Sequence, residues 1–231
     1  MQVDGVMIGY RQNRLREKTM LETNIATNSN GDREPVSRRI VPNRVAHFVV
    51  RSKNVPELVA WYKTVFQADA VFDNGQLAFL YFDDEHHRIA IASVPGLDDL
   101  NEKAAGIDHI AFTYDSIGDL LTTYARLKVA GIEPFIKIDH GPTMSLYYKD
   151  PDGNQIELQV DNFATREEAH EYFRSDAFAK NPLGVMVDPD DLLARFRAGE
   201  DQGTLLRAGT RTAQQERAVV IGRCFGRYGR T

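Results

Sequence analysis

The chain has 231 residues, of which 42% are hydrophobic and 26% are charged, values typical of a globular protein. A formal net charge of −5 gives no overall basic surface and argues against a nucleic-acid partner. Cys224 is the only cysteine, which excludes a disulfide within the chain, and no apolar run approaches the roughly 20 residues that span a bilayer. We therefore expect a cytoplasmic protein without a membrane partner.

The chain is expected to begin with an irregular arm over residues 1–42. The stretch TNIATNSNGDREP in this arm combines polar, Gly and Pro residues without an apolar period, a pattern typical of loops. Periodic sequence begins at Arg44 and fades after about Val160. We expect a single domain over residues 43–162.

This domain contains an internal repeat, with modules at about 44–95 and 106–160. In the first module the alternating segment RVAHFVV is followed by NVPELVAWYKTVFQA, whose apolar residues recur at helical spacing. In the second, GIDHIAFTY takes the place of the strand and SIGDLLTTYARLKVAG that of the helix. Asn54 can cap the first helix, with Pro56 in its first turn, and Gly131 can end the second.

Each predicted helix is followed by short strand-like segments. These are QLAFLYF and RIAIASV in the first module, and EPFIKI, MSLYYKD and NQIELQV in the second. The pattern predicts an α+β fold of two βαβββ modules that form one curved sheet with the helices outside. Residues 163–231 are expected to form a helical extension, with helices at TREEAHEYFRSDAFA and DPDDLLARFRAG, and an Arg/Gly-rich tail.

Three residues of the two modules could hold a metal ion. His47 and His109 occupy equivalent positions of the repeat, and strand alternation places Glu157 opposite Ile156 and Leu158. If the apolar set packs under the helices, Glu157 points into the concave side toward both histidines. Two imidazoles and one carboxylate are the facial triad of non-haem iron(II) oxygenases, although zinc or manganese could use the same ligands. The alternative is that the histidines bond to neighbours and Glu157 lies on a solvated face.

Four further side chains could take part in chemistry. His86 and His87 open a predicted strand, His140 lies in a loop, and Tyr147 lies in the strand that precedes Glu157. Three of them also have a purely structural alternative: a surface histidine for His86, a loop cap for His140 and a core aromatic for Tyr147.

The run from His140 to Glu157, HGPTMSLYYKDPDGNQIE, resembles the signature of type I extradiol ring-cleavage dioxygenases. The signature has a His, an apolar-Tyr pair, a Pro-x-Gly turn and a final Glu, and Asp139 departs from it because the family has a small or apolar residue there. The paired modules over residues 44–160 resemble the vicinal oxygen chelate superfamily, in which single-domain extradiol dioxygenases also have a segment similar to His86-His87-Arg88-Ile89-Ala90.

The resemblance implies an Fe(II) enzyme, with Mn(II) as the alternative metal, that opens a catechol-type diol with O₂. It implies His47, His109 and Glu157 as metal ligands and His87 as the acid/base residue, with His140 and Tyr147 bonded to the substrate oxygens. We also expect a homo-oligomer. The sequence does not distinguish a simple catechol from a polyaromatic diol.

Three other functions share this fold. An isomerase of the glyoxalase type needs a fourth ligand, normally a Glu at the end of the first module, and RIAIASV offers none. A thiol transferase of the fosfomycin type shares the His/His/Glu triad but has no need of His87, His140 and Tyr147. A binding protein of the bleomycin-resistance type lacks the metal triad.

Overall fold

The computed structural model describes residues 40–101 and 103–206. Most of the predicted arm 1–42, and the tail from 207 onward, lie outside the described residues. The chain divides into two units, residues 1–45 and 46–231, and every described helix and strand belongs to the second. Among the described residues, no helix has the length and apolar character needed to cross a membrane.

The first module has the predicted strand and helix followed by three strands. Its elements are β1 (Phe48–Ser52), α2 (Val55–Phe66), β2 (Asp69–Asp73), β3 (Leu77–Tyr81) and β4 (Ile89–Ser93). They form a sheet in the order β1-β4-β3-β2, with β1 parallel to β4. Asn54 caps α2 and Pro56 lies in its first turn, as predicted. The βαβββ pattern requires a third strand after α2, but the segment that forms it, β2, was not identified from the sequence.

The second module repeats this plan. Its elements are β5 (His109–Tyr114), α3 (Ile117–Val129), β6 (Ile136–Asp139), β7 (Thr143–Lys149) and β8 (Gln155–Asp161). They form a sheet in the order β5-β8-β7-β6-β9, with β5 parallel to β8. Ser116 caps α3, and Gly131 follows the helix with a φ of 75°, a backbone conformation that favours glycine.

The α+β class and the two βαβββ modules are therefore confirmed, but the strands form two separate sheets and not one continuous sheet. The modules contact each other through side chains. The rings of Phe48 and Phe112 lie 5.9 Å apart, the Tyr62 hydroxyl donates to Asp150 at 3.1 Å, and the Arg126 guanidinium donates to the Val65 carbonyl at 2.9 Å.

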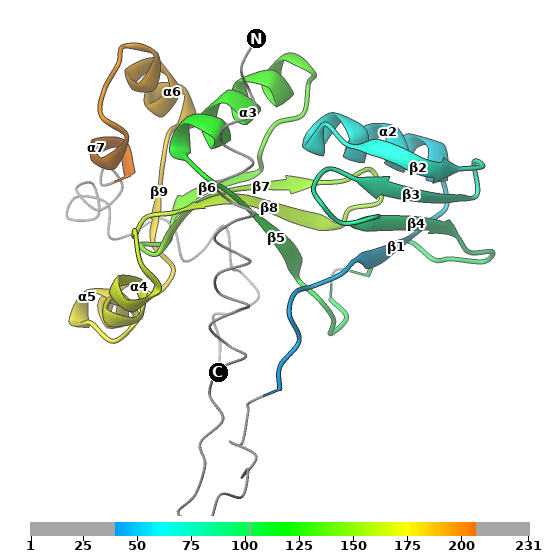
Figure 1. Ribbon diagram of the computed structural model, residues 1–231, viewed down its shortest axis with the longest axis horizontal. Coiled ribbons are helices and arrows are strands. Elements are labelled where there is room, and N and C mark those ends of the chain that lie inside the picture. Colours follow the sequence, from blue (N-terminus) through cyan, green and yellow to red (C-terminus); the bar gives the residue numbers. More distant parts are fainter. Residues whose placement is uncertain (1–39, 102, 207–231) are drawn as a thin grey trace, which may run out of the picture. The chain divides into compact units, whose positions relative to one another are not determined.

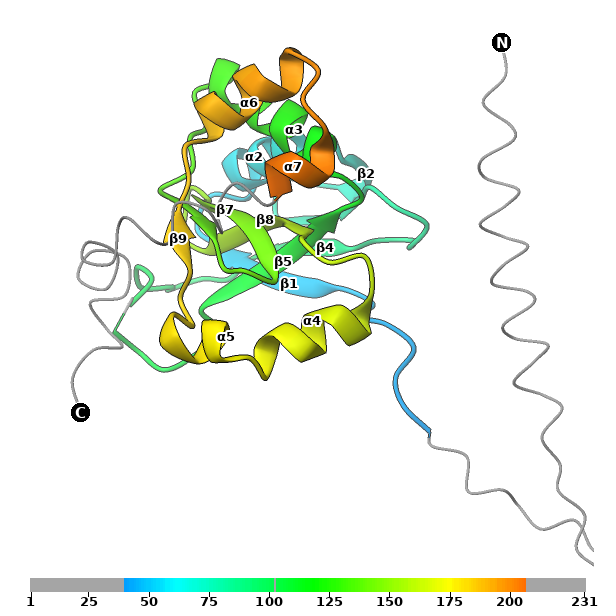
Figure 2. The same ribbon diagram turned by 90° about the vertical axis from the view of Figure 1, so that its left-hand side faces the viewer.

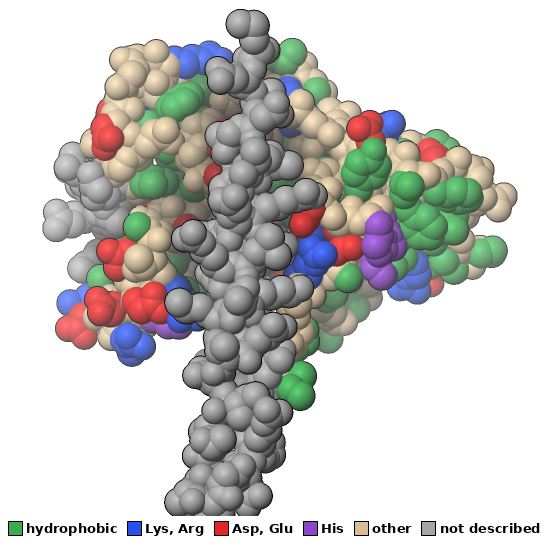
Figure 3. Space-filling view, viewed as in Figure 1, with side chains coloured by type: hydrophobic (Ala, Val, Ile, Leu, Met, Phe, Trp, Pro, Cys, Tyr) green, Lys and Arg blue, Asp and Glu red, His purple; other side chains and the backbone are tan. Residues whose placement is uncertain are grey.

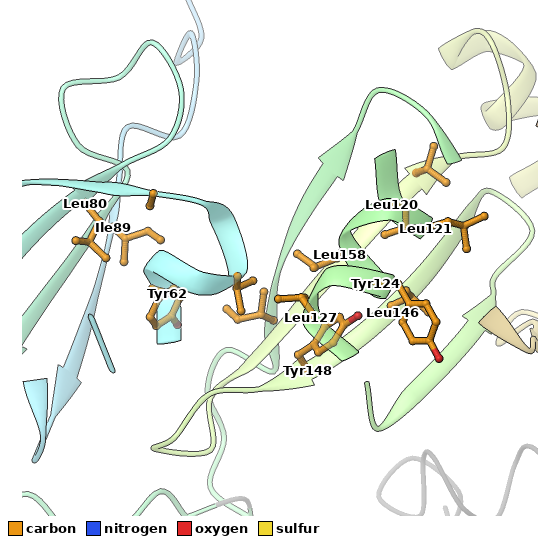
Figure 4. Close-up of a cluster of buried hydrophobic side chains, with 14 of the residues drawn as sticks. Tyr62, Leu80, Ile89, Leu120, Leu121, Tyr124, Leu127, Leu146, Tyr148 and Leu158 are labelled. Atoms are coloured by element: carbon orange, nitrogen blue, oxygen red, sulfur yellow. The ribbon is translucent and has the colours of Figure 1, made fainter. Parts of the chain in front are cut away.

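Helices α2 and α3 cover the same side of the two sheets (Figure 1), and buried apolar side chains of both modules form one core cluster. Strand alternation determines which residues enter it. In β8, Ile156, Leu158 and Val160 are buried in this core, as predicted from their parity. Figure 4 shows Tyr62 with Leu80 in the first module and Leu127 with Leu158 in the second.

The C-terminal extension consists of α4 (Arg166–Phe173), α5 (Asp176–Lys180), β9 (Val185–Met186), α6 (Pro189–Arg197) and α7 (Gln202–Leu206). The helix predicted over residues 165–179 is two helices, because the Ser175 side chain caps α5. Helices α6 and α7 lie on the α3 side of the second sheet, and α4 and α5 lie on its other side (Figure 2). Strand β9, also unpredicted, pairs antiparallel with β6.

Candidate active site

His109 and Glu157 meet on the face of the second sheet that is turned away from α3. Nε2 of His109 lies 3.0 Å from Oε2 of Glu157, a hydrogen-bond distance. The hydrogen bond to Glu157 raises the pKa of His109 to about 9. Burial acts to raise the pKa of Glu157, but hydrogen bonds from His109 and Ser145 outweigh burial and leave this pKa below its usual value.

Asp108 holds the other side of the His109 ring. Its Oδ2 lies 2.9 Å from Nδ1 of His109, so that nitrogen donates to the carboxylate. A metal-binding histidine usually donates the N–H of its other ring nitrogen to a carboxylate or carbonyl. With its Nδ1–H bonded to Asp108, His109 can present Nε2 to a metal ion. The His109 and Glu157 side chains therefore offer one nitrogen and one oxygen ligand at the same point.

Tyr147 and His140 complete this group. Tyr147 is the direct partner of Glu157 in the β7–β8 ladder, and its ring stands edge-on to His109 with the centroids 5.2 Å apart. Nε2 of His140 lies 3.0 Å from the Tyr147 hydroxyl. Burial raises the pKa of Tyr147 and lowers that of His140, so a neutral phenol and a neutral imidazole face each other.

The turn between β7 and β8 determines which way Glu157 faces. Asp150 is buried and its carboxylate accepts from the Asp152 and Asn154 backbone N–H groups at 3.0 and 2.8 Å. Gly153, with a φ of 89°, allows the chain to reverse here. These bonds explain the Asp-Pro-x-Gly part of the predicted signature, because they fix the register that places Glu157 opposite Tyr147.

His47, His86 and His87 lie together beside the first sheet, just before β1 and β4. The rings of His47 and His87 are 4.5 Å apart between centroids, and Nδ1 of His87 lies 2.6 Å from Nδ1 of His86. Burial, with His47 and His86 as neighbours, lowers the pKa of His87. The Phe79 ring, which points away from α2, lies 4.9 Å from the His87 ring.

The structure therefore brings four of the six predicted site residues together and places His47 and His87 elsewhere. Among residues 40–101 and 103–206, no group of three or more histidine, cysteine or carboxylate side chains is arranged to hold a metal ion. The equivalent strands β1 and β5 belong to different sheets, so equivalent repeat positions do not share a face.

Sequence reasoning missed three groups of this site. Asp108 and Ser145 hydrogen-bond His109 and Glu157, and the Leu183 carbonyl bonds His140. Asp108 could have been found because it precedes His109, and Ser145 because it lies two residues before Tyr147 and so shares its face. The carbonyl has no sequence signal. Tyr148 belongs to the core, and Phe48 and Phe112 pack against it, whereas Phe79 lies beside His87.

Comparisons with known proteins agree with this fold. Residues 44–158 match the model of the Glyoxalase/Bleomycin resistance protein/Dioxygenase superfamily. Biphenyl-2,3-diol 1,2-dioxygenase 3 of Rhodococcus globerulus is 40% identical over 71% of this chain and 88% of its own. Biphenyl-2,3-diol 1,2-dioxygenase 2 of the same organism is 46% identical over 63% and 77%.

Among solved structures, a glyoxylase/bleomycin resistance protein/dioxygenase domain from Frankia sp. EAN1pec is 18% identical, with a TM-score of 0.47, over 56% of this chain and 100% of that one. The identity to the two curated dioxygenases extends over most of their length, and the superfamily model covers both modules. The chain therefore belongs to the vicinal oxygen chelate superfamily and, within it, to the extradiol dioxygenases.

Proposed function

We propose that this enzyme opens the ring of a biaryl vicinal diol with O₂, and that biphenyl-2,3-diol is one of its substrates. The observation that supports this most is the grouping of His109, Glu157 and Tyr147 on one face of β5, β8 and β7, with His140 bonded to Tyr147 from the β6–β7 loop. A metal-binding pair and two polar groups that can bond hydroxyls are what a chelating diol requires. The names of both Rhodococcus relatives support the substrate class.

We propose Fe(II) as the metal, with Mn(II) as the alternative. The donor set fits, because His109 and Glu157 already meet at 3.0 Å between ligand atoms and Asp108 directs Nε2 toward Glu157. His47 would be the third ligand, which gives the two-histidine, one-carboxylate set of non-haem iron oxygenases. A ferrous ion in this set supplies Lewis acidity toward the diol and the redox chemistry that O₂ requires.

The protein's own side chains would handle protons and orientation. His87, whose pKa is lowered, is neutral near pH 7 and can accept a proton from a diol hydroxyl and return it later. Tyr147 can donate a hydrogen bond to a substrate oxygen, and His140 can accept one. Phe72 and Phe79, whose rings lie 5.9 Å apart, offer an aromatic surface beside His87 for the second ring of the substrate.

A second copy of the chain would complete the site. One chain offers His109 and Glu157 on its second sheet, and His47 and His87 beside its first. The face of the first sheet that is turned away from α2 also exposes apolar side chains, among them Val49 (57% exposed) and Phe72 (44%). Figure 3 shows histidine side chains gathered beside hydrophobic ones. We propose that this face covers His109 and Glu157 of a second copy.

The activity is tested with purified protein loaded anaerobically with Fe(II), given 2,3-dihydroxybiphenyl and then exposed to air. We expect a yellow ring-opened product, O₂ uptake in equal amount, and loss of both in Glu157→Gln. Iron binding without consumption of 2,3-dihydroxybiphenyl or 3-methylcatechol would contradict ring cleavage. A chain that binds no metal would contradict the enzyme itself.

Shared assembly of the site is tested by mixing two inactive variants. His47→Ala lacks a ligand beside the first sheet and Glu157→Gln lacks one on the second. If each site joins two copies, half of the randomly formed dimers contain one copy of each variant, and one of the two sites in such a dimer is intact. The mixture should then regain about a quarter of the wild-type activity. If one chain forms the whole site, co-expression restores nothing.

A further inference from the structure

Residues 181–187, here called the strap, run beside the start of the His140 loop. The strap lies beyond residues 44–158, which match the superfamily model. Its strand β9 pairs with β6, with Met186 opposite Ile138 and Val185 opposite Asp139. A segment outside the repeated modules therefore forms the edge of the sheet that contains the active-site face.

The strap binds the His140 ring directly. Nδ1 of His140 lies 2.7 Å from the Leu183 carbonyl oxygen. A carbonyl oxygen only accepts hydrogen bonds, so the ring nitrogen that faces it has the proton. Since burial lowers the pKa of His140, the ring is neutral and its other nitrogen has a free lone pair. That nitrogen is the one 3.0 Å from the Tyr147 hydroxyl, so the single Tyr147 proton is shared between this nitrogen and the Glu157 carboxylate, which Tyr147 also hydrogen-bonds.

The strap has two features that hold the Leu183 carbonyl in place. The Asn181 side chain donates to the Gly184 carbonyl at 2.7 Å and accepts from the Gly184 N–H at 3.2 Å, which closes the turn around Leu183. Gly184 has a φ of 95°, and a Cβ there would lie 2.0 Å from the Asp139 carbonyl oxygen and 2.6 Å from Cα of His140. Only glycine allows this close approach.

We infer that the strap is a positioning element of the active site. Its Leu183 carbonyl fixes His140 in the tautomer with a proton on the nitrogen facing the strap, so the nitrogen facing Tyr147 can only accept. His140 would then accept a hydrogen bond from a diol hydroxyl or from Tyr147, and it would not donate one to a substrate oxygen. The assignment of a diol to this site rests on the proposed function, whereas the tautomer does not.

The tautomer is measured by ¹⁵N NMR of histidine-labelled full-length protein, with His140→Gln used to assign the His140 signals. In the wild type we expect one protonated and one unprotonated ring nitrogen in a single tautomer. Asn181→Ala should release the Leu183 carbonyl and give a mixture of tautomers. It should also lower kcat with little change in KM, by about 10- to 100-fold if the loss is as large as that of an outer partner of a metal-binding histidine.

Lys180→Ala is the matched control, because Lys180 is the exposed neighbour of Asn181 at the end of α5, and it should match the wild type. Gly184→Ala is a second variant that pushes the strap away from His140, and circular dichroism establishes that each variant is folded.

A folded Asn181→Ala with the wild-type tautomer and kcat would overturn the inference, as would a wild-type ring protonated on the nitrogen facing Tyr147. If no diol is cleaved but the tautomer shifts as expected, the proposed function fails and the positioning role stands.

Discussion

Oδ2 of Asp108 bonds Nδ1 of His109 at 2.9 Å, just as the Leu183 carbonyl bonds Nδ1 of His140 at 2.7 Å. Each histidine therefore has one nitrogen occupied by an acceptor that lies away from the site. The other nitrogen of each points at its partner in the site, Glu157 for His109 and Tyr147 for His140. The anionic acceptor, Asp108, holds His109, which we assign to the metal. The neutral Leu183 carbonyl holds His140, which we assign to the substrate.

Removal of Asp108 should weaken metal binding. In Asp108→Ala the Nδ1–H of His109 loses its carboxylate partner, so the ring is free to rotate and Nε2 becomes a weaker donor. We expect the affinity for Fe(II) to fall by about 10- to 100-fold, measured by anaerobic competition with a chelator. Asp115→Ala, an exposed aspartate between β5 and α3, is the control. Equal affinities in the two variants would contradict the role of Asp108.

His87 should separate catalysis from metal binding. His87→Gln removes the proposed acid/base group but none of the proposed ligands, so kcat should fall by about 10² to 10⁴ while the iron content stays at the wild-type level. The neighbouring His86→Gln is the control, because the His86 side chain is 74% exposed, and it should cost far less. Loss of iron in His87→Gln would instead make His87 a ligand.

Much of the fold could be predicted from the sequence because local signals agreed with the final packing. The Asn54 cap, the glycine that ends the second helix (Gly131) and the strict alternation of β8 indicated both helices and the side on which Glu157 lies. The two-residue strand β9 could not be predicted, since its only support is pairing with β6. The short β2 was missed as well, because it is largely exposed and has little apolar alternation.

The site was predicted less completely for a related reason. Glu157, Tyr147 and His140 were predicted together because the signature sequence and strand parity both describe neighbours within one sheet. The expectation that His47 and His109 share a site came from their equivalent positions in the repeat and from the family resemblance, and a repeat fixes the position of a residue only in its own module. It does not fix how one module is placed against another module of the same chain or of a second copy.

Phe79 should determine substrate preference. Its ring lies 4.9 Å from His87 on the face that we assign to the second ring of a biaryl diol. Phe79→Ala should raise KM for 2,3-dihydroxybiphenyl by about tenfold, corresponding to one lost aromatic contact, and change KM for 3-methylcatechol much less. Phe173→Ala, at an exposed position of α4, is the control. An equal rise in KM for both diols would mean that Phe79 supports the fold and does not contact the second ring of the substrate.

Asp139 should make the protein less stable as the pH rises toward neutrality. It is 1% exposed, its Oδ1 accepts from the Gly141 N–H and the Asn162 side chain, and its Oδ2 is buried without a partner among the described residues. Burial raises the pKa of Asp139 to about 6. The folded chain therefore binds this proton more tightly than the unfolded chain, and folding stability falls between about pH 4 and pH 6 as the carboxyl ionises.

Asp139→Asn keeps the Oδ1 acceptor and removes the charge. We expect it to raise the free energy of unfolding at pH 7.5 by on the order of 2 kcal/mol and to have little effect at pH 4. The measurement is urea unfolding of the metal-free protein at both pH values, since bound metal would add stability of its own. Asp161→Asn, at the exposed end of β8, controls for loss of a surface carboxylate. A gain of equal size at both pH values would mean that burial of the charge is not what limits stability at this position.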